Sequence, residues 1–229
     1  MEGTSASTGL LALVGGGEWS EGAEFDAELL ERSGGTEVLV LPTAAAYQRP
    51  DKAVAWAERW FAHLGASVRP LMVLRHTDAL EAENVLVVAQ SRFVYLAGGS
   101  PLHLRSVLKG SPLFDALVTA WRGGAVVAGS SAGAMVLCDP MIDPRGGAFT
   151  VGLGLVEQLA VAPHHHPGGS HLLWRTLELA PVGVAVAGIP ERTALLRERD
   201  GSWRAAGAAA KDVTIYLDGK VVGLGALPA

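Results

Sequence analysis

The sequence predicts an α/β fold, in which a doubly wound, mostly parallel sheet is flanked by helices. Short apolar runs alternate with segments of helical periodicity over most of the chain. The 29 glycines among 229 residues favour many tight turns, and a hydrophobic content of 49% supplies a substantial core. We therefore expect one domain over residues 1–229, with residues 1–8 as a flexible tail.

The first part of the chain supports this fold element by element. Apolar runs predict strands at 10–14, 37–41, 68–73, 93–96 and 125–128. Apolar residues at helical spacing predict helices at 24–32, 50–64, 78–88, 102–109 and 112–122. Pro42 ends the second strand, Gly65 suits the end of the second helix, and Ser111-Pro112 suits the start of the last.

The pattern changes after about residue 147. A strand near Val161, a helix at 172–179 and a strand at 182–189 are expected to continue the sheet. Short strands and turns follow, with Asp200-Gly201 and Asp218-Gly219 as hairpin turns. This end of the chain predicts an antiparallel edge or a small C-terminal ribbon.

Charge and cysteine content narrow the function classes. A net charge of −5 gives no reason to expect nucleic acid or an anionic membrane as a partner. The single cysteine, Cys138, cannot form an intrachain disulfide and is expected in the core. We find no pattern of a signal peptide or a membrane span, so we expect a reducing compartment and a cytoplasmic protein.

One stretch combines a strand, a sharp turn and a helix. The apolar run 125–128 enters Gly129-Ser130-Ser131-Ala132-Gly133, a G-x-S-x-G match centred on Ser131. In a nucleophile elbow this serine lies on a strained turn, and the next backbone N–H points to the same place. Because G-x-S-x-G is common, an ordinary βα turn is the alternative interpretation.

A serine nucleophile needs a base, and the base needs an orienting acceptor. Three histidines, His164, His165 and His166, follow Pro163 at the expected end of a strand. Adjacent side chains on an extended chain point to opposite faces, which argues against a shared metal ion and predicts that His165 points away from the serine. The other alternative to a general base is that these three histidines are ordinary surface residues. Glu191, after the next apolar strand, is a candidate orienting carboxylate or a solvated loop residue.

Together these segments resemble the dipeptidase E and cyanophycinase family of serine peptidases. The resemblance rests on Gly129–Ala134, Gly152–Leu155, Pro163-His164 and Ile189–Glu191, with Leu96–Ser100, Gly15–Glu18 and Leu41–Ala44 in support. It implies a glutamine-amidotransferase-like fold with serine in place of cysteine, and no cofactor or metal.

The resemblance also implies residue roles. Ser131 would be the nucleophile, His164 the base and Glu191 its partner, with Asp139 or Asp143 as alternative acids. The N–H groups of Gly99 and Ala132 would form an oxyanion hole. The substrate-binding residues expected are Gly98, Ser100, His103, His166 and Arg175.

The implied substrate is a small peptide or isopeptide, cleaved next to an acidic residue that an arginine would bind. The polymer cyanophycin is the alternative substrate, although the arginine-rich helix usual after the histidine is missing. The second hypothesis is an inactive binding or interaction protein on the same fold, and the third is an enzyme that transfers an amide nitrogen from glutamine. The sequence leaves open whether the chain forms a homodimer.

Overall fold

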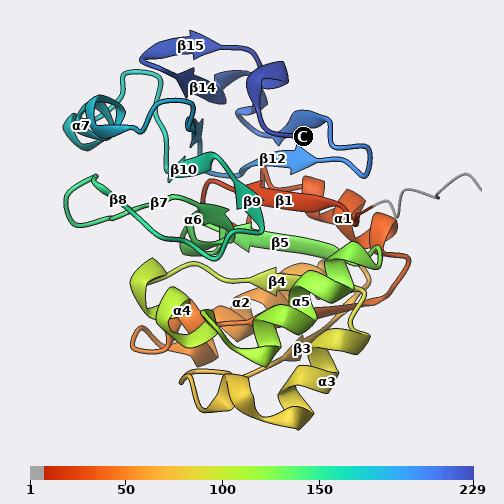
Figure 1. Cartoon of the computed structure of the whole chain (residues 1–229). Helices are drawn as coiled ribbons and strands as arrows, with labels where there is room; N and C mark the ends of the chain where they lie inside the picture. The colour runs from red at the N-terminus through yellow and green to blue at the C-terminus, as the bar shows by residue number, and fades with distance from the viewer. Residues whose placement is uncertain (1–7) are drawn as a thin grey trace, which may run out of the picture.

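A computed structural model describes residues 8–229 and has a seven-stranded sheet at its centre (Figure 1). The strand order is β13-β12-β1-β5-β4-β2-β3. Strands β1, β5, β4, β2 and β3 are parallel, and β12 and β13 are antiparallel additions beside β1. The strands are β1 (Leu11–Val14), β2 (Glu37–Leu41), β3 (Ser67–Pro70), β4 (Phe93–Leu96), β5 (Val126–Ser130), β12 (Thr193–Arg197) and β13 (Trp203–Gly207).

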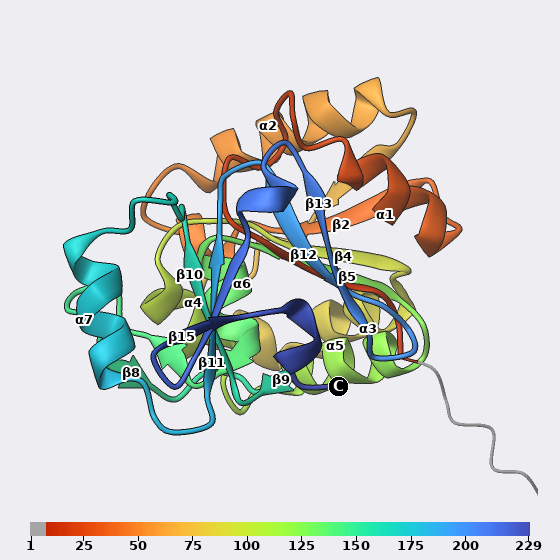
Figure 2. The same ribbon diagram turned by 90° about the horizontal axis from the view of Figure 1, so that it is seen from above.

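Helices cover both faces of this sheet, because its strands are apolar on both sides. Leu10, Ala12 and Val14 pack with α1 and α2 in one core cluster, whereas Leu11 and Leu13 belong to a second cluster that includes α3, α4, α5 and α6. Figure 2 shows the sheet between these layers. The helices are α1 (Phe25–Ser33), α2 (Pro50–His63), α3 (Ala82–Gln90), α4 (Pro101–Leu108), α5 (Pro112–Arg122), α6 (Ala132–Leu137) and α7 (His171–Leu179).

A second, four-stranded sheet lies beside the first and has the order β10-β11-β14-β15. Its strands are β10 (Leu159–Pro163), β11 (Ala185–Ile189), β14 (Thr214–Leu217) and β15 (Lys220–Val222). The expectation that β10 and β11 continue the main sheet is therefore wrong. The edge beside β1 is occupied by β12, so β10 and β11 pair with each other instead.

The expected antiparallel C-terminal edge is present and is divided between the two sheets. Its first hairpin, β12-β13, extends the main sheet, and its second, β14-β15, extends the smaller one. Two further ribbons, β6-β9 and β7-β8, follow the elbow helix; their strands are β6 (Cys138–Asp139), β7 (Met141–Ile142), β8 (Phe149–Thr150) and β9 (Val156–Glu157).

Three elements differ from the sequence-based expectations by three residues or more at one boundary, and one of them is the strand expected at 182–189, which begins at Ala185. The strand expected at 68–73 ends at Pro70, and the helix expected at 78–88 is a 3₁₀ turn at Asp78–Leu80 followed by α3. Of the expected tail, residues 1–7 lie outside the described residues, and Thr8 accepts a hydrogen bond from Arg197 at 3.1 Å. None of the helices within residues 8–229 is long and apolar enough to cross a membrane.

Candidate active site

The G-x-S-x-G segment forms the turn between the central strand β5 and helix α6. Ser131 has φ 47° and ψ −103°, a sparsely populated region for a residue with a side chain. A Cβ on Gly129 would lie 2.6 Å from the carbonyl carbon of Gly133, and one on Gly133 would lie 2.4 Å from the Leu96 carbonyl oxygen. Both flanking glycines are therefore required for the chain to turn this tightly.

Two side chains from the ends of β10 and β11 complete a chain of hydrogen bonds. Ser131 Oγ lies 2.9 Å from His164 Nε2, and His164 Nδ1 lies 3.0 Å from Glu191 Oε1. An ionised carboxylate only accepts, so Nδ1 carries the proton and Nε2 is left to accept from the serine hydroxyl. The side chains of His164 and Glu191 are each about half exposed, so this series of hydrogen bonds is accessible to solvent.

The alternative acids have other partners. Asp139 Oδ1 accepts from the Gly152 N–H at 2.7 Å, and Asp143 forms an ion pair with Arg145 at 2.6 Å. Hydrogen bonds from Arg145 hold the pKa of Asp143 at about 2. The geometry thus favours Glu191 over both as the partner of His164.

The glycine turn after β1 supports the histidine. The His164 N–H donates to the Gly15 carbonyl at 2.8 Å, and the Arg192 N–H donates to the Gly16 carbonyl at 2.7 Å. Gly16 has φ 115°, and a Cβ there would lie 2.3 Å from His164 Cε1. The imidazole therefore lies close to the Gly16 backbone, which leaves no room for a side chain at that position.

Glu18, in the same turn, is a site residue that the sequence reasoning missed. Its Oε2 accepts from the Ser130 hydroxyl at 2.6 Å, and its Oε1 accepts from the Gly98 N–H at 3.1 Å. One carboxylate thus connects three strand ends: the β1 turn, the β4 turn and the elbow. The available signal was an acidic residue directly after a glycine run at the end of a strand.

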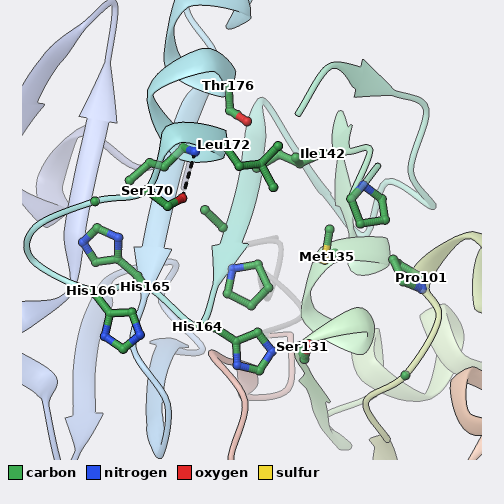
Figure 3. Close-up of a pocket in the computed structure, with 16 residues that line it drawn as sticks. Pro101, Ser131, Met135, Ile142, His164, His165, His166, Ser170, Leu172 and Thr176 are labelled. Carbon is green, nitrogen blue, oxygen red and sulfur yellow. Dashed lines mark hydrogen bonds between the residues drawn. The ribbon is translucent and has the colours of Figure 1, made fainter. Parts of the chain in front are cut away.

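Of the two expected oxyanion donors, Gly99 lies in the turn after β4 and Ala132 lies in the elbow itself, at the start of α6. Gly99 has φ 139°, and a Cβ there would lie 2.3 Å from the Ala44 carbonyl oxygen, so the turn admits only glycine. Within residues 8–229, neither the Gly99 N–H nor the Ala132 N–H donates to a protein acceptor. Gly99 and Ser131 line the same pocket, whose volume is about 270 Å³ (Figure 3).

The expected substrate-binding residues are only partly brought together. His166 lines the pocket, whereas Gly98, Ser100, His103 and Arg175 do not. Ser100 accepts from the His103 N–H as the N-cap of α4, and His103 Nε2 is bonded to the Leu74 carbonyl at 2.9 Å. Arg175 lies on α7 in a separate surface hollow with Trp174 and Glu178.

The histidine run is not an extended chain, because His164 has φ 54°. His165 is nevertheless turned into the protein: it is 5% exposed, packs against Gly188, and lies 6.2 Å from the Tyr216 ring. Alternation was therefore the wrong reason, although Ser131 is bonded to His164 and not to His165. Within residues 8–229, no group of three or more His, Cys, Asp and Glu side chains is arranged to hold a metal ion.

Comparison with known proteins finds similar chains among peptidases and cyanophycinases. The cyanophycinase of Synechococcus elongatus is 27% identical over 216 residues, which cover 89% of this chain and 67% of that protein. The crystal structure of a peptidase from an acI-B1 Actinobacterium superposes with a TM-score of 0.79 at 29% identity, covering 94% of this chain and 96% of that one. A peptidase E protein from Listeria monocytogenes, at 18% identity, shares the fold with a TM-score of 0.68, covering 88% of this chain and 100% of that one.

The family model of peptidase family S51 matches residues 11–202, a span that includes the glycine turn after β1, the elbow, His164 and Glu191. The resemblance to dipeptidase E and cyanophycinase is thereby confirmed, and so is the α/β fold that it implies. The chain belongs to peptidase family S51.

Proposed function

We propose that the protein hydrolyses short peptides through an acyl-enzyme, with Ser131 as nucleophile, His164 as general base and Glu191 as the group that orients the histidine. The observation that carries this proposal is the unbroken series of hydrogen bonds from Ser131 Oγ through His164 to Glu191, at 2.9 and 3.0 Å. Membership of a peptidase family gives the reaction class.

The geometry supports a definite sequence of proton transfers. Ser131 Oγ attacks the peptide carbonyl carbon while its proton passes to His164 Nε2. The carbonyl oxygen becomes an anion, which the Gly99 and Ala132 N–H groups stabilise by donating hydrogen bonds. His164 then protonates the leaving amine, and the C–N bond breaks. A water molecule then gives a proton to His164 Nε2 and attacks the carbonyl carbon of the resulting ester. The ester bond to Ser131 breaks, His164 returns the proton to Ser131 Oγ, and the acid is released.

Two other functions use the same fold. An inactive binding protein does not need a serine hydroxyl held at hydrogen-bond distance from an imidazole that is itself bonded to a carboxylate. Amidotransfer from glutamine is disfavoured because the elbow carries serine rather than cysteine.

A cytoplasmic location and a homodimer remain predictions.

The test is covalent labelling with a fluorophosphonate, followed by mass spectrometry of the modified peptide. We expect labelling at Ser131 in the wild-type protein and none in Ser131→Ala. Ser130→Ala is the matched control, because Ser130 is the buried neighbour that bonds to Glu18.

The same variants are then compared on a panel of dipeptides, β-Asp-Arg and cyanophycin. Ser131→Ala should lose kcat by several orders of magnitude, as in other enzymes with this group of residues, while Ser130→Ala retains turnover. Absence of both labelling and hydrolysis in the wild-type protein would favour the inactive binding protein instead.

A further inference from the structure

We propose that the pocket beside Ser131 selects an uncharged, apolar side chain next to the scissile bond, of the size of leucine or methionine. This inference rests on the proposed function, because it assigns the substrate class of the same site. It departs from the acidic residue that the sequence resemblance implies.

The pocket wall is mostly apolar and comes from several parts of the fold. Met135 lies one turn beyond Ser131 on α6, Ile142 lies on β7, and Leu172 and Leu173 lie on the first turn of α7. Pro101 and Pro144 add to this wall. Figure 3 shows Ser131 and His164 at one end of the pocket and Leu172 and Ile142 at the other. A side chain that enters beside the nucleophile therefore meets a mostly hydrocarbon wall.

The described residues that line the pocket include no aspartate, glutamate, lysine or arginine. Arg145, the nearest arginine in sequence to Pro144, is engaged by Asp143 through two of its nitrogens, at 2.6 and 3.0 Å. Arg175 faces a different hollow. A substrate carboxylate would thus meet no lysine or arginine to replace its water, and a substrate guanidinium would meet no aspartate or glutamate.

Besides Ser131, the polar side chains of the lining are those of Ser170, Thr176 and the three histidines His164, His165 and His166, and none of them carries a permanent charge. Ser170 Oγ accepts from the Leu173 N–H as the N-cap of α7. Thr176 is 2% exposed. Burial, with a contribution from His166, lowers the pKa of His165 and favours its neutral form. His164 is committed to Ser131 and Glu191. Met135, Ile142 and Leu173 are each less than 10% exposed, so this part of the wall belongs to the packed core.

The size of the pocket also suits one side chain and adjoining backbone. Its volume of about 270 Å³ lies near the lower end of the range for ligand sites, roughly 300–1,000 Å³. One methylene in a hydrophobic pocket changes kcat/KM by roughly 10- to 200-fold. We expect Leu or Met to be preferred over Asp, Glu and Arg by at least about tenfold at one of the two positions that flank the scissile bond.

The experiment varies each position of a dipeptide against alanine at the other: X-Ala and Ala-X, with X as Leu, Met, Phe, Asp, Glu or Arg. Wild-type kcat/KM gives one ranking. The Kd values of Ser131→Ala give a second, because that variant holds the dipeptides without cleaving them. Preference for Leu or Met over all charged residues at one position supports the proposal. Preference for a charged residue, or no preference, overturns it.

A charge introduced into the wall sharpens the test. Leu172→Arg places a cation in the pocket at a residue that is 41% exposed, so the fold should tolerate it. We expect the ratio of Leu to Asp peptides to fall by at least about tenfold, from the loss of a hydrophobic contact and the gain of a cation. Leu179→Arg is the matched control, since Leu179 lies on the same helix, is 46% exposed and does not line the pocket. An equal change in both variants overturns the assignment.

The two readouts separate this inference from the proposed function. Tight binding of apolar dipeptides by Ser131→Ala, without turnover or labelling of the wild-type protein, would contradict the peptidase and leave the pocket assignment intact. Turnover confined to Asp, Glu or Arg peptides would contradict the pocket assignment and leave the peptidase intact.

Discussion

The nucleophile and its base are positioned in different ways. Ser131 is held by its own neighbours, in a turn between β5 and α6 that is dictated by Gly129 and Gly133. His164 and Glu191 follow β10 and β11, which belong to the second sheet, yet the His164 N–H is bonded to Gly15 at the end of β1 in the first. The position of the base is therefore a property of the contact between two sheets.

Because of this difference, different substitutions should disturb the nucleophile and the base. A local turn survives as long as its glycines remain, whereas the base requires that both sheets, the Gly15-Gly16 turn and the segment around Arg192 all remain in contact. Changes at the contact between the sheets, including the Gly15-Gly16 turn, should misplace the imidazole, and changes at Glu18 should affect the turns around Ser131.

Among the residues that position the nucleophile and the base, the largest effect is expected from Glu191→Gln. Glutamine can present an N–H group to His164 Nδ1 and favour the wrong tautomer, for which the corresponding change in another serine peptidase costs about 10⁴-fold in kcat. Because Glu191 is about half exposed, we expect a loss of about 10²- to 10⁴-fold. The measurement is kcat on the best dipeptide, with Asp139→Asn and Asp143→Asn as controls. Loss of turnover in either control with an active Glu191→Gln would transfer the role to that aspartate.

The next largest effect is expected from Gly16→Ala, at the contact between the sheets. The added Cβ would lie 2.3 Å from His164 Cε1, so the imidazole must move away from Ser131. A displacement of about 1 Å can cost about 10²-fold in rate, and we expect a loss of that order in kcat. Gly65→Ala is the control, because it also has a positive φ but nothing within 4 Å of its added Cβ. Comparable losses of activity in both variants would show that backbone strain alone is responsible.

A smaller effect is expected from Glu18→Ala, on the first-sheet side. This variant releases the Gly98 N–H and the Ser130 hydroxyl, and so loosens the turn that carries Gly99. We expect kcat to fall about tenfold, which is less than the roughly 10²- to 10³-fold cost of deleting an oxyanion donor outright. Glu18→Gln retains groups that can bond to both partners and should be milder. Wild-type kcat in Glu18→Ala would show that the elbow needs no such support.

The smallest effect on activity is expected from Asp26→Asn, which should change stability instead. Asp26, on α1, is fully buried and accepts from Trp60 Nε1 at 2.9 Å. Burial raises the pKa of its carboxyl well above the ordinary value, the Trp60 hydrogen bond lowers it, and the charge of Glu18 raises it further. The unfolded chain, with an ordinary pKa of about 3.9, therefore loses this proton first as the pH rises.

The stabilising contribution of Asp26 is thus complete below about pH 4 and is lost as the pH rises through its folded-state pKa. Each unit by which the pKa is raised corresponds to about 1.4 kcal/mol. Asp26→Asn has no charge to bury, so its free energy of unfolding should gain on that of the wild type as the pH rises above about 4. Denaturant melts at several pH values measure this, and parallel pH profiles would contradict the buried charge.

The same contrast explains what could be predicted from the sequence. The elbow was visible because its strand, turn and helix are adjacent in the chain, and His164 and Glu191 because each follows an apolar strand. The second sheet could not be predicted, because hydrophobic periodicity identifies a strand but not the strand with which it pairs. The orientation of His165 was argued from an extended chain, whereas the positive φ of His164 depends on its contact with Gly15. The position of Arg175 depends on how α7 packs, which the sequence pattern does not determine.

Only residues 190–192 separate β11 in the smaller sheet from β12 in the larger one, and Glu191 is the middle residue of that crossing. The segment is too short to absorb a rotation of one sheet against the other, so such a rotation must displace Glu191 and, through it, His164. Turnover should therefore report the alignment of the two sheets. A change in turnover should thus detect strain applied between the β12-β13 and β14-β15 hairpins, although both hairpins lie far along the chain from Ser131.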